Sequence, residues 1–206
     1  MKHSTNSVVL LAVAAAASLP AQEAAPRHEL GLTLGRRQPL SRGNGSTGLE
    51  LQSGTALQAN YGYRLIGGDK AALYGEVHFL STPQQQVSSA NTALTRDVAT
   101  IFLTPGVRVK FMPARAVSPY LAIGAGWALF EHSKLTLGGS PNPAPRTVSH
   151  GVVSYGGGVD VKVWRWLGAR GELRDFYAGS PSYNAAGLRG GQHNVVVGGG
   201  IVLRFR

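Results

Sequence analysis

Hydrophobic and polar residues alternate along most of this chain. From Val153 to Val163 the odd positions carry valine, tyrosine or glycine, and the even positions carry serine, glycine, aspartate or lysine. After the short segment Trp164–Trp166 the alternation resumes from Leu167 to Arg174. A period of two over two such runs predicts β-strands with one apolar and one polar face. The short connection between them predicts an antiparallel hairpin.

The same alternation marks six further segments, which brings the predicted number of strands to eight. They are Glu29–Gly35, Leu57–Leu65, Leu73–Phe79, Thr100–Phe111, Leu121–Leu129 and Val195–Phe205. Pro105 is the one misfit, because a proline removes a hydrogen bond from the interior of a sheet. The chain therefore belongs to the all-β class, and the order of its segments predicts an up-and-down antiparallel barrel.

The charged residues of the predicted strands share the polar face almost without exception. That set comprises Glu29, Arg64, Glu76, Arg108, Lys110, Asp160, Lys162, Arg170, Glu172, Arg174 and Arg204. Only Asp175, at the end of its strand, falls on the apolar face. Such sorting indicates that the alternation reflects real strand faces.

Long polar loops and short turns alternate between the strands. The expected long loops are Arg36–Thr55, Ser81–Asp97, Glu131–Val148 and Tyr177–His193, and the expected turns are Gly67–Lys70, Pro113–Ser118 and Trp164–Trp166. Loops of this length are unusual within a compact soluble domain. Their regular placement is typical of barrels in outer membranes, where long loops face outward and short turns face the periplasm.

The alternation alone leaves open which face points inward, since a soluble lipocalin-like barrel would enclose its apolar face. Three features favour the opposite arrangement. The polar face carries mainly small or charged residues, as a narrow filled lumen requires. Aromatic residues gather at the strand ends, as in membrane barrels: Tyr63, Phe111, Trp164, Trp166 and Phe205 at the turn side, and Phe79, Trp127, Phe130 and Tyr177 at the loop side. The last strand ends in Leu203-Arg204-Phe205-Arg206, similar to the C-terminal signal for barrel insertion.

The first residues have the pattern of an export signal. Lys2 precedes the apolar stretch Val8–Ser18, and small residues follow before Gln22. This predicts a secretory signal peptide over residues 1–21 and a barrel domain over residues 22–206. No later stretch is apolar for long enough to form a transmembrane helix. The net charge is +10, but the basic residues are scattered singly, so nucleic-acid binding is not expected.

With its export signal, eight strands, loop rhythm and glycine-rich hairpin, the chain resembles the small outer-membrane β-barrel family, which includes the OmpA-like transmembrane domain. The resemblance covers essentially the whole mature chain. It implies a location in the outer membrane of a Gram-negative cell envelope, and insertion by the barrel-assembly machinery through the C-terminal strand. No peptidoglycan-binding domain is expected after Arg206, so the anchoring role of longer members does not carry over.

The residues predict no catalytic, cofactor-binding or metal-binding site, and no cofactor. The lumen charges are interpreted as a structural ion-pair network, for example Arg170 and Arg174 around Glu172, and Lys162 near Asp160. Their positive excess, seven cations to four carboxylates in the set above, leaves a narrow anion-preferring pore as an alternative. His150 and His193 are interpreted as rim residues. The triplets Gly156–Gly158 and Gly198–Gly200 are interpreted as barrel bends or sites of close packing.

Glu131-His132-Ser133 raises a second alternative, a hydrolase barrel that modifies lipid, because lipid A deacylases place a histidine, a serine and a glutamate on the lipid-facing side. Here the histidine and the serine are adjacent, so a strand directs them to opposite faces and separates nucleophile from base. A soluble periplasmic ligand-binding barrel is the third alternative.

The favoured interpretation is a non-enzymatic outer-membrane barrel whose loops carry any specificity. Seven basic residues are expected on the exterior: Arg36, Arg37, Arg42, Arg96, Lys134, Arg146 and Arg189. Fewer acidic residues accompany them, chiefly Glu50, Asp97 and Glu131. Because arginine pairs well with phosphate, the expected partner is outer-membrane lipid, especially lipopolysaccharide. Equally, these side chains could be solvated loop charges.

Overall fold

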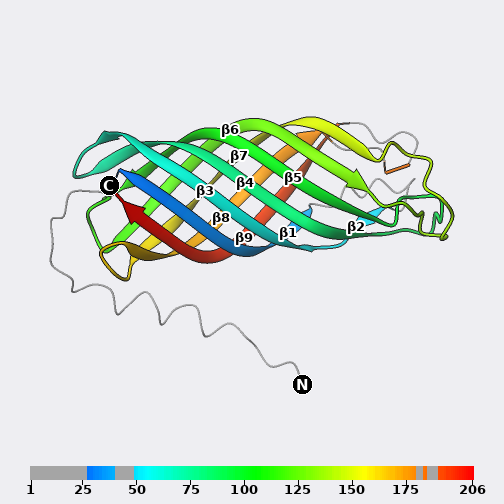
Figure 1. Ribbon diagram of the computed structural model, residues 1–206, viewed down its shortest axis with the longest axis horizontal. Coiled ribbons are helices and arrows are strands. Elements are labelled where there is room, and N and C mark those ends of the chain that lie inside the picture. The colour runs from blue at the N-terminus through cyan, green and yellow to red at the C-terminus, as the bar shows by residue number, and fades with distance from the viewer. Residues whose placement is uncertain (1–26, 40–48, 180–182, 185–189) are drawn as a thin grey trace, which may run out of the picture.

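The computed structural model describes residues 27–39, 49–179, 183–184 and 190–206. The predicted signal peptide, residues 1–21, lies outside the described residues. The described residues form nine strands along one long axis (Figure 1): β1 (His28–Pro39), β2 (Glu50–Leu51), β3 (Gly54–Gly67), β4 (Ala71–Ser88), β5 (Asp97–Phe111), β6 (Val117–His132), β7 (Thr147–Lys162), β8 (Leu167–Gly179) and β9 (Gly191–Phe205). Within the described residues, no helix is long and apolar enough to cross a membrane.

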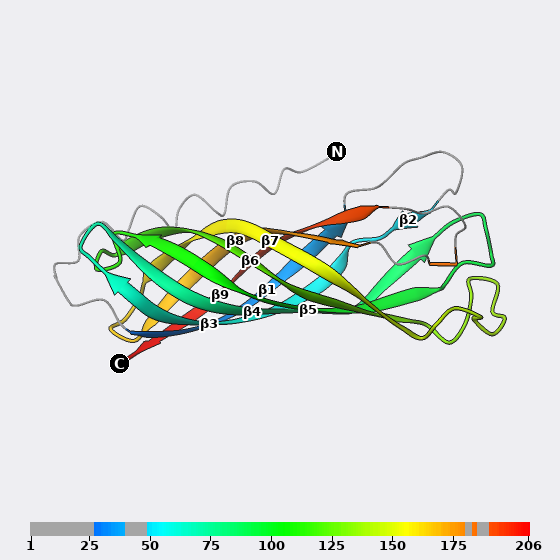
Figure 2. The ribbon, with the colours of Figure 1, turned by 90° about the horizontal axis from the view of Figure 1, so that it is seen from above.

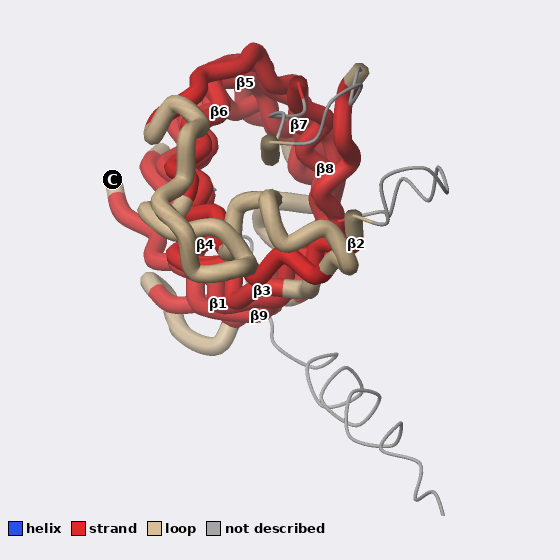
Figure 3. The backbone as a smooth tube through the Cα atoms, turned by 90° about the vertical axis from the view of Figure 1, so that its right-hand side faces the viewer, coloured by secondary structure: helices blue, strands red, loops and turns tan. Residues whose placement is uncertain are grey.

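Eight of these strands form a closed antiparallel barrel, which confirms the predicted fold class. Each strand pairs with its neighbours in chain order, and β1 pairs with β9 from His28↔Phe205 to Pro39↔Asn194 to close the ring. The short strand β2 is an addition that pairs only with the loop end of β4. Seen from the loop end, the strands form a ring with loops lying across part of its mouth (Figure 3).

The strands extend further toward the loop end than the hydrophobic pattern predicts (Figure 2). β1 continues to Pro39, β4 to Ser88, β6 to His132 and β8 to Gly179, so parts of all four expected loops are strand. In this region the outward side chains become polar while inward ones stay buried, as with exposed Ser88 next to buried Val87 on β4. The apolar outer face therefore stops before the strand does, which is why the sequence pattern ended the strands too early.

Pro105 lies within β5 and does not break it. Its side chain points outward, and β4 pairs with this position through Val77. On the β6 side the pairing passes from Leu103↔Trp127 to Gly106↔Gly124 and omits the positions between them. Pro105 thus occupies a local gap in the β5–β6 ladder. The backbone hydrogen bond that a proline cannot donate is not required there.

The apolar face points outward along the barrel wall. Leu121 and Trp127 are 62% and 63% exposed, whereas Arg108 and Asp160 are 0% exposed. The aromatic residues expected at the two girdles are exposed, apart from Phe130, which is 1% exposed. The expectation for Phe130 is wrong because its neighbour Leu129 takes the outward position on β6, so the phenyl ring points into the lumen.

Candidate functional site

A layer of ion pairs fills the lumen toward the turn end. Asp160 accepts two hydrogen bonds from Arg170, from Nε at 2.7 Å and from Nη2 at 2.9 Å, and its Oδ2 lies 2.6 Å from Lys110 Nζ. Glu29 contacts Lys110 Nζ at 2.5 Å and Arg108 Nη2 at 2.7 Å. All five side chains are at most 3% exposed. These groups come from β1, β5, β7 and β8, so the contacts tie strands across the barrel.

The layer continues through two further carboxylates. Glu76 accepts a hydrogen bond from Arg174 Nη2 at 2.7 Å and lies 3.3 Å from Arg108 Nε. Glu172 accepts one from the Tyr120 hydroxyl at 2.5 Å and lies 3.4 Å from Arg174 Nε. Every buried carboxylate of the layer thus contacts a cation, as burial of charge requires.

The predicted lumen residues divide into two groups. The deeply buried members are four carboxylates, Glu29, Glu76, Asp160 and Glu172, and four cations, Arg108, Lys110, Arg170 and Arg174. Arg64, Lys162 and Arg204 are only partly buried, and Arg204 lies 3.7 Å from Glu29 and Asp160. The deep layer is therefore electrically balanced, and the positive excess counted in the sequence lies in the less buried members. Arg170 contacts Asp160 directly, a pairing that the sequence analysis did not anticipate.

Above the ion pairs, toward the loop end, an apolar cluster occupies part of the lumen. Phe102, Phe130 and Phe176 pack together there, with ring centroids 6.0 Å apart for Phe102–Phe130 and 5.2 Å apart for Phe102–Phe176. Leu80, Val98, Val196 and several alanines complete the cluster. The sequence analysis missed this layer, although all three phenylalanines occupy the polar parity of their strands. This departure from the alternation could have indicated an apolar layer inside the lumen.

Loop residues close the apolar layer from the loop end. Leu94 is 0% exposed and Tyr183 is 1% exposed, and both belong to the same cluster. Backbone bonds join the loops: Leu137 N donates to Leu94 O at 2.9 Å, and Thr95 N donates to Tyr183 O at 3.2 Å. Asn142 and Asn184 add side-chain bonds between the loops. Burial raises the pKa of the Tyr183 phenol, which keeps it neutral. The described loops thus form a packed cover.

Arg37 belongs to the lumen and not to the exterior, so that expectation is wrong. Because β1 continues to Pro39, the alternation directs Arg37 inward, where it is 0% exposed. Its Nη2 donates to Asn194 Oδ1 at 2.6 Å, and its guanidinium carbon lies 5.2 Å from the centroid of the Phe102 ring. No carboxylate of the described residues pairs with it.

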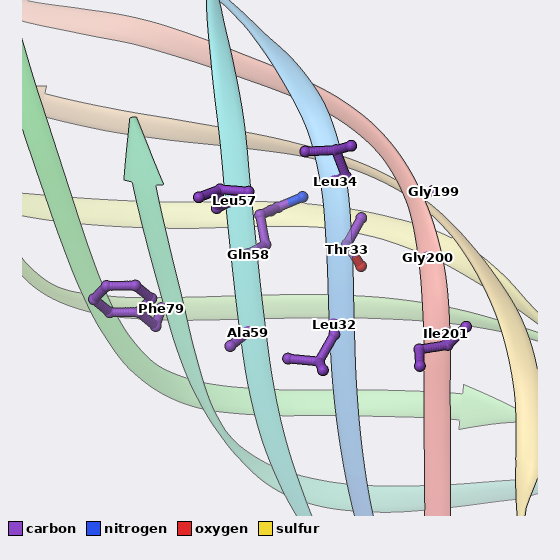
Figure 4. Close-up of a pocket in the computed structure, with 10 residues that line it drawn as sticks. All are labelled: Leu32, Thr33, Leu34, Leu57, Gln58, Ala59, Phe79, Gly199, Gly200 and Ile201. Atoms are coloured by element: carbon purple, nitrogen blue, oxygen red, sulfur yellow. The ribbon is translucent and has the colours of Figure 1, made fainter. Parts of the chain in front are cut away.

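A groove of about 440 Å³ lies on the outside of the wall, over β9, β1, β3 and β4 (Figure 4). Its apolar lining consists of Leu32, Leu34, Leu57, Ala59, Phe79, Gly199 and Ile201. These apolar side chains face outward from four adjacent strands, while Thr33 and Gln58, which also line the groove, are buried in the wall. Gly199 and Ala59 leave the space that larger residues would occupy.

Asp175 is the charged residue that points outward from its strand. Its Oδ2 accepts hydrogen bonds from His193 Nδ1 at 2.5 Å and from the Tyr155 hydroxyl at 2.8 Å, and its Oδ1 accepts one from the backbone N–H of Asn194 at 3.0 Å. Asp175 is half-buried by these partners. The carboxylate is therefore fully engaged with neighbours on β7 and β9.

The wall, the filled lumen and the loop rhythm can be compared with known proteins. The model of the family described as the outer membrane protein beta-barrel domain matches residues 9–199. This chain belongs to that family. The protein is thus an outer-membrane barrel, which confirms the predicted family and location and excludes the soluble periplasmic alternative.

Solved structures agree with the fold. Neisserial surface protein A is 14% identical to this barrel, with a TM-score of 0.57 over 89% of this chain and 100% of the other. The outer membrane protein OprG from Pseudomonas aeruginosa is also 14% identical, with a TM-score of 0.54 over 89% of this chain and 98% of the other. At this identity the likeness concerns the fold alone. None of the curated proteins compared matches the chain.

The outer-membrane barrel does not bring His132 and Ser133 together as nucleophile and base. His132 is 1% exposed, and its Nδ1 donates to Pro145 O at 2.8 Å. The Ser133 hydroxyl bonds to Leu135 O and accepts from the backbone N–H of Arg96. Glu131 is exposed and pairs with Arg146 Nη2 at 2.5 Å. Each residue of the triplet thus has a different partner.

The remaining exterior cations differ in their surroundings. Arg36 is exposed, and its Nε and Nη2 donate to Ser53 Oγ at 2.9 and 2.6 Å. Arg96 and Lys134 are exposed on the loops, whereas Arg146 is paired with Glu131. Arg42 and Arg189 lie outside the described residues. His150 packs against Phe130 near the loop end, with ring centroids 5.9 Å apart.

Proposed function

We propose that this outer-membrane barrel is a non-enzymatic surface protein that binds phosphorylated lipid of the outer leaflet, namely lipopolysaccharide. The observation that carries the proposal is the division of the charges. The charges of the ion-pair layer are paired with one another and Arg37 is buried, whereas Arg36, Arg96 and Lys134 are exposed at the loop end without a carboxylate partner among the described residues. In this class of barrel the long loops face the cell exterior.

Arginine and lysine at this position suit phosphate. A guanidinium presents several donors in a fixed plane and forms two-point contacts with phosphate oxygens, and lysine adds a compact positive charge. Arg36 lies near the loop end of β1, and Arg96 and Lys134 lie next to the loop ends of β5 and β6, on the side that faces the cell exterior in this class of barrel. Since such contacts are partly solvated, they weaken as salt screens them over about 8–10 Å.

Because the lumen is filled with side chains, a binding role on the exterior is favoured over ion conduction through a pore. The deep ion-pair layer is balanced, the apolar layer above it is packed with aromatic rings, and loop residues such as Leu94 cover that layer. A permeating anion would have to displace paired charges and then pass three buried phenylalanines. An interior of eight strands is just wide enough for its own side chains.

Lipid hydrolysis has one observation in its favour, the outward Asp175–His193 pair, since a histidine held by a carboxylate is half of a catalytic triad. The hydroxyl bonded to this pair belongs to Tyr155, and it donates to the aspartate and not to the histidine. A nucleophile must contact the base directly. The pair is better explained as an anchor that shields an outward carboxylate at the membrane boundary.

Two further partner expectations remain proposals. Insertion by the barrel-assembly machinery through the C-terminal strand fits the register, because β9 must find β1 before the ring can close. Nucleic acid is not a proposed partner, because the exposed cations are separated by polar loop segments and form no continuous track.

The test compares two triple variants that lose the same charge. Arg36→Ser, Arg96→Ser and Lys134→Ser remove the exterior cations, and Lys70→Ser, Arg115→Ser and Arg206→Ser remove exposed cations at the turn end. Retention of each purified barrel on immobilised lipopolysaccharide is measured at low and high salt. We expect the exterior variant to lose the salt-sensitive part of binding and the turn-end variant to keep it. Equal retention of both variants and the parent at both salts would refute the proposal.

A further inference from the structure

We infer that the outer groove over β9, β1, β3 and β4 holds one acyl chain of a lipopolysaccharide molecule whose phosphate pairs with Arg36. The inference rests on the proposed function and adds to it a single site of defined shape. It joins two features, an apolar depression in the wall and a cation on the same strand at its outer end.

The depression exists because two positions in the wall have small side chains. Gly199 lies opposite Leu34 in the β1–β9 ladder, and Ala59 lies opposite Leu32 in the β1–β3 ladder. Phe79, on β4, lies opposite Ala59 and borders the groove on that side, and Ile201 borders it from β9 (Figure 4). The side chains that face outward into the groove are therefore apolar, whereas the lining residues Thr33 and Gln58 are buried in the wall. The groove volume of about 440 Å³ falls within the range of ordinary ligand sites.

Arg36 stands at the outer end of this groove. It follows Leu34 by two residues on the same face of β1, which places it about 7 Å further toward the loop end. The Ser53 hydroxyl accepts from its Nε and Nη2, so the guanidinium is held in position without being neutralised. Its ladder partners are Thr55 and Val197, and neither carries a charge. Among the described residues no carboxylate pairs with Arg36, so the cation is pre-oriented to bind an anion.

An acyl chain with a phosphate head fits this arrangement better than a second copy of the barrel. The groove lies in the apolar band and ends at a cation. A phosphorylated outer-leaflet lipid has the matching order, an apolar acyl chain followed by a phosphate. A dimer with its axis along the membrane normal would use the same patch on both copies, because a two-fold interface is self-complementary. It would bring two Arg36 side chains together at the same depth, and like charges repel.

Two matched variants add a leucine side chain to the outer wall, one inside the groove and one away from it. A Cβ at Gly199 would meet only Arg170 O at 3.7 Å, so Gly199→Leu adds a side chain to the groove without a backbone clash. A Cβ at Gly151, on the outward face of β7, would meet nothing within 4 Å. Gly151→Leu therefore adds the same side chain to the wall away from the groove. Ala59→Leu is a second groove variant, used if Gly199→Leu fails the heat-modifiability test for a folded barrel.

The probes are intact lipopolysaccharide, its O-deacylated form and its dephosphorylated form, each titrated against the barrel in detergent. We expect the parent and Gly151→Leu to prefer intact over O-deacylated lipid. We expect Gly199→Leu to bind intact lipid about tenfold more weakly, with no change for the O-deacylated form. A loss of about tenfold corresponds to the burial of a few methylene groups of the acyl chain. Arg36→Ser should remove the preference for phosphate.

The outcomes separate this site from the broader proposal. If folded Gly199→Leu and Ala59→Leu bind intact lipid as the parent does, the groove is not the seat of the acyl chain, even where the exterior triple variant loses binding. If the parent binds no lipopolysaccharide at all, both the site and the proposed function are wrong. A loss for Gly151→Leu equal to that for Gly199→Leu would show an effect of the wall in general and would also overturn the site.

Discussion

Arg170 donates two parallel hydrogen bonds to Asp160, at 2.7 and 2.9 Å, between paired positions of β8 and β7. Lys110, on β5, contacts the same carboxylate at 2.6 Å. All three groups are buried, so removing the negative charge of Asp160 leaves the buried cations Arg170 and Lys110 without this counter-charge. We expect Asp160→Asn to lower the free energy of unfolding by about 3–5 kcal/mol. Urea unfolding of the barrel refolded in lipid vesicles measures the change.

The exposed pair Arg146–Glu131 is the matched control for that experiment, since both side chains are about half exposed. Arg146→Gln should cost about 0–1 kcal/mol, the usual range for a solvated ion pair. An effect of Asp160→Asn no larger than that of Arg146→Gln would contradict the assignment of the lumen charges as a network that stabilises the barrel.

The outward face of β7 tests which part of the wall meets lipid. Val159 and Ser149 both point outward from this strand, Val159 within the apolar band and Ser149 near the loop end. Val159→Arg should destabilise the barrel in bilayers by about 2–4 kcal/mol if it lies near the midplane, and Ser149→Arg by about 0–1 kcal/mol. Both are measured by the same unfolding titration. Equal tolerance at the two positions would mean that the apolar band does not face lipid.

The lumen predicts an absence of steady ion flow. The charges of the ion-pair layer are balanced, and the aromatic layer of Phe102, Phe130 and Phe176 lies between this layer and the loop end. Purified barrel inserted into planar bilayers should therefore show no regular conductance steps at moderate voltage. Reproducible anion-preferring steps from folded protein would restore the narrow pore that the sequence left open.

Replacement of the outward histidine tests the absence of lipid chemistry. We expect His193→Ala, and likewise His132→Ala and Ser133→Ala, to leave the mass spectrum of lipid A unchanged when the protein is overproduced. His193→Ala should instead loosen the Asp175 contact with β9, visible as a modest loss of stability. A lipid A mass shift produced by the parent and abolished by any of these variants would show that the barrel is an enzyme.

The sequence predicted the strands, their faces and the closed barrel because alternation is a local property that each strand shows by itself. It could not predict where the strands end, since the outer face of β4 becomes polar before Ser88 while the inner face remains buried. The misplacement of Arg37 followed from that error in β1. Pro105 was tolerated because the β5–β6 ladder leaves a gap at its position, which depends on two strands at once.

The candidate sites required knowledge of three-dimensional neighbours. Asp160 and Arg170 could be paired only after the hairpin register was known, and the sequence placed Lys162 nearer to the aspartate. Asp175 was recognised as an exception to the alternation, but its partner His193 lies on another strand. The groove was invisible because its lining comes from four strands, and a glycine such as Gly199 has meaning there only beside Leu34.

Native mass spectrometry of the barrel, released from outer membranes in mild detergent, tests most directly whether the lipid face binds lipopolysaccharide at Arg36 and the groove. The parent and Gly151→Leu should retain one lipopolysaccharide molecule at collision energies that remove ordinary phospholipid. Arg36→Ser and Gly199→Leu should each lose that adduct while remaining folded. Parent protein free of lipopolysaccharide, or an adduct that survives equally in all four proteins, would contradict the account.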